Sequence, residues 1–123
     1  MRPLVHPSPD TITVEGILHA LSDPVRVQIF SEIAACKGSQ ICSAFLELNN
    51  RPIPKSTLSQ HFKALREAGL ITSERRGVEM HNTSRCEEIN ATFPGLLPAI
   101  MNAHRVQMAR QRPAARKKRA KQG

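Results

Sequence analysis

The stretch from Pro54 to Ile71, PKSTLSQHFKALREAGLI, decides the fold. On a helix, at about 100° per residue, Leu58, Phe62 and Leu65 fall within about 60° of one another and form a narrow apolar stripe. Gly69 is the expected left-handed residue beyond the helix end, and the chain then resumes in an apolar, β-branched register. The stretch therefore predicts a helix packed on a core, a glycine stop and a following strand.

The side of this helix opposite the stripe is polar. It carries Ser56, Ser59, Gln60 and Lys63. Hydroxyls and a side-chain amide can bond base edges, and an ammonium group suits phosphate. Glu67 lies on the same side, one turn too far along to enter a groove. The competing interpretation is an ordinary amphipathic helix whose polar face meets only water, so the rest of the chain has to be considered.

Two blocks of sequence carry a family resemblance. One consists of Ser56 to His61 (STLSQH) with Leu65 to Ile71 (LREAGLI), and the other is the upstream Leu21 to Arg26 (LSDPVR). With these blocks, the chain resembles the bacterial ArsR-type winged helix-turn-helix repressors from about Val14 to Gln107. The resemblance implies a mainly α fold with a small β-hairpin, homodimeric through its first and last helices. It also implies repression that a signal releases.

The partner implied by this resemblance is double-stranded DNA with a pseudo-palindromic operator, read by two recognition helices in successive major grooves. His61 is expected on the flank of its helix, near the DNA backbone. Two arginines at the hairpin tip would reach phosphates or a minor groove, although arginines on a turn are as often merely solvated. The candidate DNA-contacting residues are Lys55, Ser56, Thr57, Ser59, Gln60, His61, Lys63, Arg75 and Arg76.

The remaining elements follow from periodicity and from turn signals. Apolar residues spaced i, i+3, i+4, i+7 from Val14 predict a first helix, and Ser22-Asp23-Pro24 ends it and starts a second. A glycine-containing turn between two partly alternating segments predicts the hairpin, or wing. The expected elements are helices over about 14–21, 24–36, 41–48, 55–68, 86–93 and 96–108, and strands over about 71–75 and 78–83.

The length of the chain and the distribution of its charge limit the possible domain organisation. A chain of 123 residues is one domain, which we divide into a flexible N-terminal arm (1–12), the winged domain (13–109) and a basic disordered tail (110–123). The tail holds seven of the 18 Lys and Arg residues, and residues 1–109 carry a net charge of only +1, eleven bases against ten acids. Basicity alone therefore leaves open a second function, that of a basic RNA-associated or nucleoid-type protein without a sensed signal.

Several classes of protein are disfavoured. No apolar run approaches the roughly 18 residues that span a bilayer, and no signal peptide is visible, so we expect a cytoplasmic protein without membrane contact. The five histidines are scattered, and no catalytic combination can be singled out. Members of the resembled family often bind metal, but Cys42 and His104 each stand alone where ligands would be expected. We expect neither an enzyme, nor a metal site, nor a cofactor.

Two cysteines suggest that the releasing signal is thiol oxidation. Cys36 and Cys42 flank Lys37-Gly38-Ser39, and a six-residue separation across a glycine turn can bring two Cα atoms within disulfide range. The adjacent lysine and a nearby helix N-terminus would both favour the reactive thiolate. The alternative is that both are small buried apolar residues. Redox sensing by this pair is one hypothesis for the signal, with Cys86 a bystander.

Overall fold

The structure is a computed structural model that describes residues 6–35, 40–41, 47–48 and 51–111. The main helices are α1 (Val14–Ala20), α2 (Pro24–Ala35), α3 (Lys55–Glu67), α4 (Cys86–Thr92) and α5 (Leu96–Arg110). The strands are β1 (Gln40–Ile41), β2 (Glu47–Leu48), β3 (Arg51–Pro52), β4 (Ile71–Arg76) and β5 (Glu79–Ser84), and a 3-10 turn, η1 (Pro9–Thr11), precedes α1. The prediction of a mainly α fold with a small hairpin is confirmed.

Helix α2 is central, because it packs against α3, α5 and β5. Its residues Ile29, Phe30 and Ile33 are fully buried. The predicted cap at the start of α2 is present, since Asp23 Oδ1 accepts from Val25 N at 2.8 Å. A cap that was not predicted starts α1, where Thr13 Oγ1 accepts from Gly16 N at 3.0 Å. The buried residues of α2 therefore lie at the centre of the core, and Asp23 caps the N-terminal end of this helix.

Helix α3 and the hairpin, or wing, are joined through Gly69. Leu58, Phe62 and Leu65 are buried, and Gly69 has a φ of 85°. Strands β4 and β5 pair antiparallel from Ile71↔Ser84 to Arg76↔Glu79, so Gly77 and Val78 form the two-residue tip of the hairpin. The predictions of the stripe, the left-handed glycine and the wing are all confirmed.

The expectation of a third helix from Ile41 to Leu48 is wrong at its described ends. Gln40 and Ile41 form β1, which pairs with β5 at Asn82 and His81, and Glu47 and Leu48 form β2, which pairs with β3. Residues 42–46 lie outside the described part of the chain. The apolar periodicity of this segment suggested a helix. The backbone N–H and C=O groups on the side of β5 away from β4 need partners, however, and β1 pairs with them as a strand.

The N-terminal segment is also more tightly held than the predicted flexible arm. In residues 6–12, His6 Nε2 accepts from Ser73 N at 2.9 Å, and Pro7 O accepts from Arg85 Nη1 at 2.9 Å. Ile12 is buried in the core. The His6 imidazole thus accepts from the backbone of β4, and the Pro7 carbonyl accepts from the buried Arg85. Sequence periodicity alone does not reveal these two contacts.

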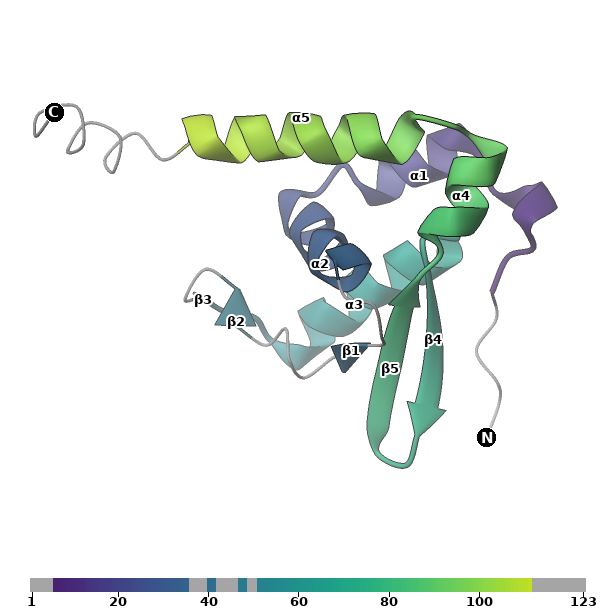
Figure 1. Ribbon diagram of the computed structural model, residues 1–123. Coiled ribbons are helices and arrows are strands. Elements are labelled where there is room, and N and C mark those ends of the chain that lie inside the picture. Colours follow the sequence, from purple (N-terminus) through teal and green to yellow (C-terminus); the bar gives the residue numbers. More distant parts are fainter. Residues whose placement is uncertain (1–5, 36–39, 42–46, 49–50, 112–123) are drawn as a thin grey trace, which may run out of the picture.

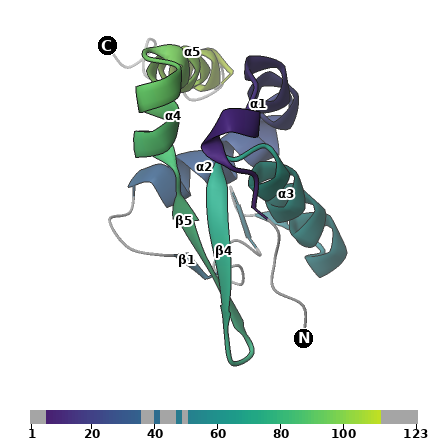
Figure 2. The same ribbon diagram turned by 90° about the vertical axis from the view of Figure 1, so that its right-hand side faces the viewer.

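Figure 1 shows α1 and α5 at one end of the molecule and the β4–β5 hairpin projecting from the other, and Figure 2 shows the same arrangement from the side. Helix α3 lies on the hairpin side of α2. Helix α5 ends at Arg110, one residue into the predicted tail, and residues 112–123 lie outside the described part of the chain. The fold therefore separates an end formed by α1 and α5 from the end that carries α3 and the hairpin.

Candidate nucleic-acid interface

The outer face of α3 is polar and exposed. It rests on the buried stripe of the same helix, which fixes the orientation of the face relative to the core. Lys63 forms a long ion pair with Glu67, at 4.0 Å, and both side chains are well exposed, so this pair holds the ammonium only weakly. The exposed candidates on the helix are Lys55, Ser56, Thr57, Ser59, Gln60 and Lys63.

The hairpin tip supplies the second group of candidates. Arg75 and Arg76 end β4 and are exposed, and the neighbouring Val78 is 96% exposed. Arg76 Nε donates to Glu74 Oε1, which partly neutralises one of the two guanidinium groups. At its base the hairpin is fixed by the buried pair in which Ser73 Oγ donates to Asn82 Oδ1 at 2.7 Å. The tip therefore projects from an anchored base.

His61 does not lie on an exposed flank. Its side chain is only 8% exposed, and Nδ1 accepts from Arg26 Nε at 3.2 Å. Arg26 Nη1 also donates to Ala20 O at 3.5 Å, so this arginine links the end of α1 to α3 through α2. The position of His61 was misjudged because it lies only about 40° from Leu65 around the helix, at the edge of the stripe. That spacing was the signal that could have revealed its burial.

Burial lowers the pKa of His61 below its usual value of 6.5, the charge of Arg26 lowers it further, and Asp23 opposes both. The unfolded chain therefore binds the proton more readily than the folded chain. It follows that stability is retained above pH 6.5 and falls as the pH drops below it.

We expect the unfolding free energy of the wild type to decrease from roughly pH 7.5 to pH 5.5 more steeply than that of a His61→Asn variant. Urea unfolding followed by circular dichroism at both pH values measures the difference. His19 is an exposed histidine of α1, and a His19→Asn variant is expected to keep the wild-type pH dependence. Equal pH dependence in the wild type and His61→Asn would contradict this prediction.

The end of the molecule formed by α1 and α5, opposite the hairpin, exposes apolar side chains. Leu18 of α1 is 48% exposed and Val106 of α5 is 50% exposed. Leu18 belongs to the apolar spacing that predicted the first helix, yet no part of the described chain covers it fully. Both residues therefore lie on the helices at the end of the molecule that is opposite the hairpin.

The remaining chemistry is limited. Within the described part of the chain, no group of three or more His, Cys, Asp or Glu residues is gathered that could hold a metal ion. None of the described helices is long and apolar enough to cross a membrane. Cys86 is half-buried, whereas Cys36 and Cys42 lie outside the described residues, so the disulfide hypothesis stays a prediction.

Comparisons with known proteins agree with this geometry. Residues 21–74, which run from the end of α1 through α3 into β4, match a helix-turn-helix domain family. The solved structure of an ArsR-like transcriptional regulator from Rhodococcus sp. RHA1 superposes with a TM-score of 0.53 and 25% identity, covering 81% of this chain and 91% of that one. These matches support the resemblance of the chain to the ArsR-type helix-turn-helix regulators.

Two curated members of the ArsR-type family match over part of their length. Both are the HTH-type transcriptional repressor SmtB of Mycobacterium tuberculosis, from strains CDC 1551 / Oshkosh and ATCC 25618 / H37Rv. Each is 38% identical over 64 residues, which is 52% of this chain and 44% of the relative, so the match spans less than half of SmtB. The fold predicted from sequence is confirmed, and these matches support the predicted family. These relatives are regulators and not enzymes, as expected.

Proposed function

We propose that the chain is a homodimeric transcriptional repressor that reads double-stranded DNA with α3. The observation that carries this proposal is the exposed polar face of α3, held on a buried stripe and accompanied by the arginines of the wing tip. Hydroxyls, an amide and two ammonium groups on one helix provide both base-edge and phosphate contacts. In this proposal His61 positions α3, and the other eight candidates contact DNA.

The second part of the proposal is the dimer. The exposed Leu18 and Val106 lie at the end formed by α1 and α5, away from the hairpin. A second copy covering this end would leave both α3 helices free to enter successive major grooves, which corresponds to a pseudo-palindromic operator. The basic segment beyond Arg110 would add affinity through phosphate contacts without choosing sequence.

Gln60→Ala is the decisive substitution, because a side-chain amide pairs with adenine edges. On the site obtained by selection from random duplexes, we expect the variant to lose about 1–3 kcal/mol of binding free energy, and much less on random DNA. Fluorescence anisotropy with both duplexes at a fixed salt concentration measures the two losses.

A matched control is Asn90→Ala, since Asn90 is an exposed amide on α4, away from the proposed interface. It should bind both duplexes as the wild type does. Equal losses on selected and random DNA in Gln60→Ala would show that α3 contacts only the backbone. A wild type without sequence preference would instead favour the nucleoid-type function.

We further propose that oxidation of Cys36 and Cys42 releases the repressor from DNA. The support is their spacing across Lys37-Gly38-Ser39, upstream of the recognition helix. Mild oxidation is expected to weaken operator binding by the wild type and to leave Cys36→Ser and Cys42→Ser unaffected. Mass spectrometry of the oxidised protein reports the loss of two hydrogen atoms on disulfide formation, as two protons and two electrons that pass to the added oxidant, with Cys86→Ser as the control. An unchanged oxidant response in both variants would assign the signal elsewhere.

A further inference from the structure

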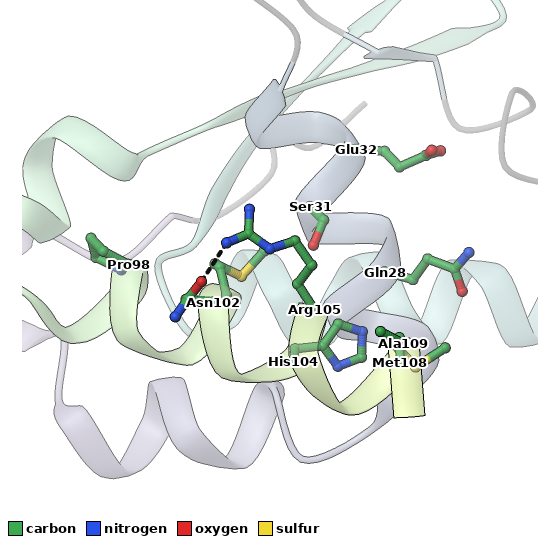
Figure 3. A pocket seen from close by; sticks show the side chains of 10 residues that line it. Gln28, Ser31, Glu32, Pro98, Asn102, His104, Arg105, Met108 and Ala109 are labelled. Atoms are coloured by element: carbon green, nitrogen blue, oxygen red, sulfur yellow. Dashed lines mark hydrogen bonds between the residues drawn. The ribbon is translucent and has the colours of Figure 1, made fainter. Parts of the chain in front are cut away.

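Two open pockets lie along α2 and share Gln28 and Met108 in their walls. The first, between α2 and α5, is shown in Figure 3. Polar groups in it bond within the chain: Arg105 donates to Asn102, as the figure shows, and Ser31 Oγ donates to Val27 O at 2.8 Å. These groups are therefore less available to a ligand.

The second pocket lies between the start of α2, the segment before α3 and the end of α5, and has a volume of about 630 Å³. Small-molecule sites commonly have volumes of roughly 300–1,000 Å³. Its walls are largely apolar, formed by Val25, Ile53, Met108 and three prolines, and its polar groups include Thr57 and His61. None of the described residues that line it is Asp, Glu, Lys or Arg. These walls suit an uncharged, mainly apolar molecule.

His61 gives this pocket a directional donor. The side chain is more than nine-tenths buried and lines the pocket, and its Nδ1 is occupied as an acceptor from Arg26 Nε. A neutral imidazole that accepts through Nδ1 carries its proton on Nε2. Because burial favours the neutral form, Nε2–H remains a donor at neutral pH.

We propose that this second pocket binds a small uncharged organic molecule with an apolar body and one hydrogen-bond acceptor, such as a carbonyl oxygen, which accepts from His61 Nε2. Thr57 and His61 belong to α3, Val25 and Gln28 to α2, and Met108 to α5. An occupant therefore contacts the recognition helix itself, α2, which packs against that helix, and the end of α5. A ligand that fits one arrangement of these helices better than the DNA-bound arrangement must weaken DNA binding, by linkage. This regulatory consequence rests on the proposed function, whereas the binding site itself does not.

The direct test uses acetophenone, which has a carbonyl on an aromatic body, and ethylbenzene, which has nearly the same shape without the acceptor. Each is titrated at pH 7.5 into the full chain, and amide and methionine methyl signals are followed by NMR. Acetophenone is expected to bind saturably and roughly 2- to 10-fold more tightly than ethylbenzene, the margin of one net hydrogen bond. The absence of saturable binding by acetophenone would overturn the proposal.

Three variants locate the site. His61→Phe keeps a ring but removes the donor, and should reduce acetophenone affinity to that of ethylbenzene. Met108→Trp fills the space and should abolish binding of both probes. Met101→Trp is the matched control, because Met101 lies on the same helix but lines only the first pocket. Unaltered binding in Met108→Trp, or an equal loss in Met101→Trp, would contradict the assignment even if His61→Phe does not fold.

The regulatory consequence has a separate readout. Saturating acetophenone is expected to weaken binding to the selected duplex by about fivefold or more, the usual lower range of coupling between two sites, and ethylbenzene by less. Met108→Trp should bind the duplex with no response to either probe. Probe binding without any preference for a selected duplex would leave the pocket in place and refute the repressor function. Sequence-specific binding without a response to a bound probe would refute only the coupling.

Discussion

A Leu65→Ala variant is expected to lose about 2–5 kcal/mol of unfolding free energy. Leu65 is fully buried beneath the polar face of α3, and truncation removes its burial and leaves a cavity among core residues that include Phe62 and Ile29. A domain of this size is stabilised by only about 5–15 kcal/mol, so the loss is a large fraction of the total. Chemical unfolding at pH 7.5 measures it.

The control lies on the other side of the same helix. Gln60→Ala replaces an exposed residue by the best helix former and should leave stability nearly unchanged while removing sequence preference. Leu65→Ala should show the reverse at a temperature where it remains folded, with preference for the selected duplex retained. If Leu65→Ala were as stable as Gln60→Ala, the stripe would not be anchoring α3.

The second large effect is expected at the junction between α3 and β4. Gly69 has a φ of 85°, and a Cβ there would approach Ile12 Cγ1 and Cδ1 to 2.5 Å. Gly69→Ala should therefore lose about 1–2 kcal/mol for the left-handed backbone and about 1–3 kcal/mol for overpacking. The measurement is again the free energy of unfolding.

Gly77 separates the two contributions. Its φ is 64°, but a Cβ there would meet nothing within 4 Å in the described part of the chain, so Gly77→Ala should show only the backbone cost. In a double-mutant cycle, Ile12→Ala should reduce the cost of Gly69→Ala to nearly that of Gly77→Ala. Equal costs for the two glycine variants in the wild-type background would show that the N-terminal segment moves aside freely.

The features predicted correctly from the sequence are those that depend on residues close together in the chain. The stripe of α3, the left-handed Gly69 and the cap at Asp23 depend on residues within a turn or two of one another. The exposed members of the candidate interface were predictable for the same reason, since the stripe fixes which side of α3 faces outward. Helix periodicity thus determined most of the site.

The failures concern contacts between residues far apart in the chain. The strand at Gln40 and Ile41 exists because β5 offers an open edge, and the segment around His6 is ordered by donors on Ser73 and Arg85. Periodicity along the sequence carries no information about the contacts of Gln40, Ile41 and His6, so it favoured a helix and a free arm. His61 is a different case: its hydrogen-bond partner Arg26 lies 35 residues earlier, but its place about 40° from Leu65 already indicated burial at the edge of the stripe.

The contact between His6 and Ser73 has a consequence for association between molecules. β4 is the outer strand of the three-stranded sheet, and a backbone N–H left unpaired on such an edge is a template for a strand of another molecule. His6 fills that position at Ser73 with a side chain, and the rest of the segment turns away through η1. While His6 occupies this position, a strand of a second molecule cannot pair with the backbone N–H of Ser73 and extend the ladder there.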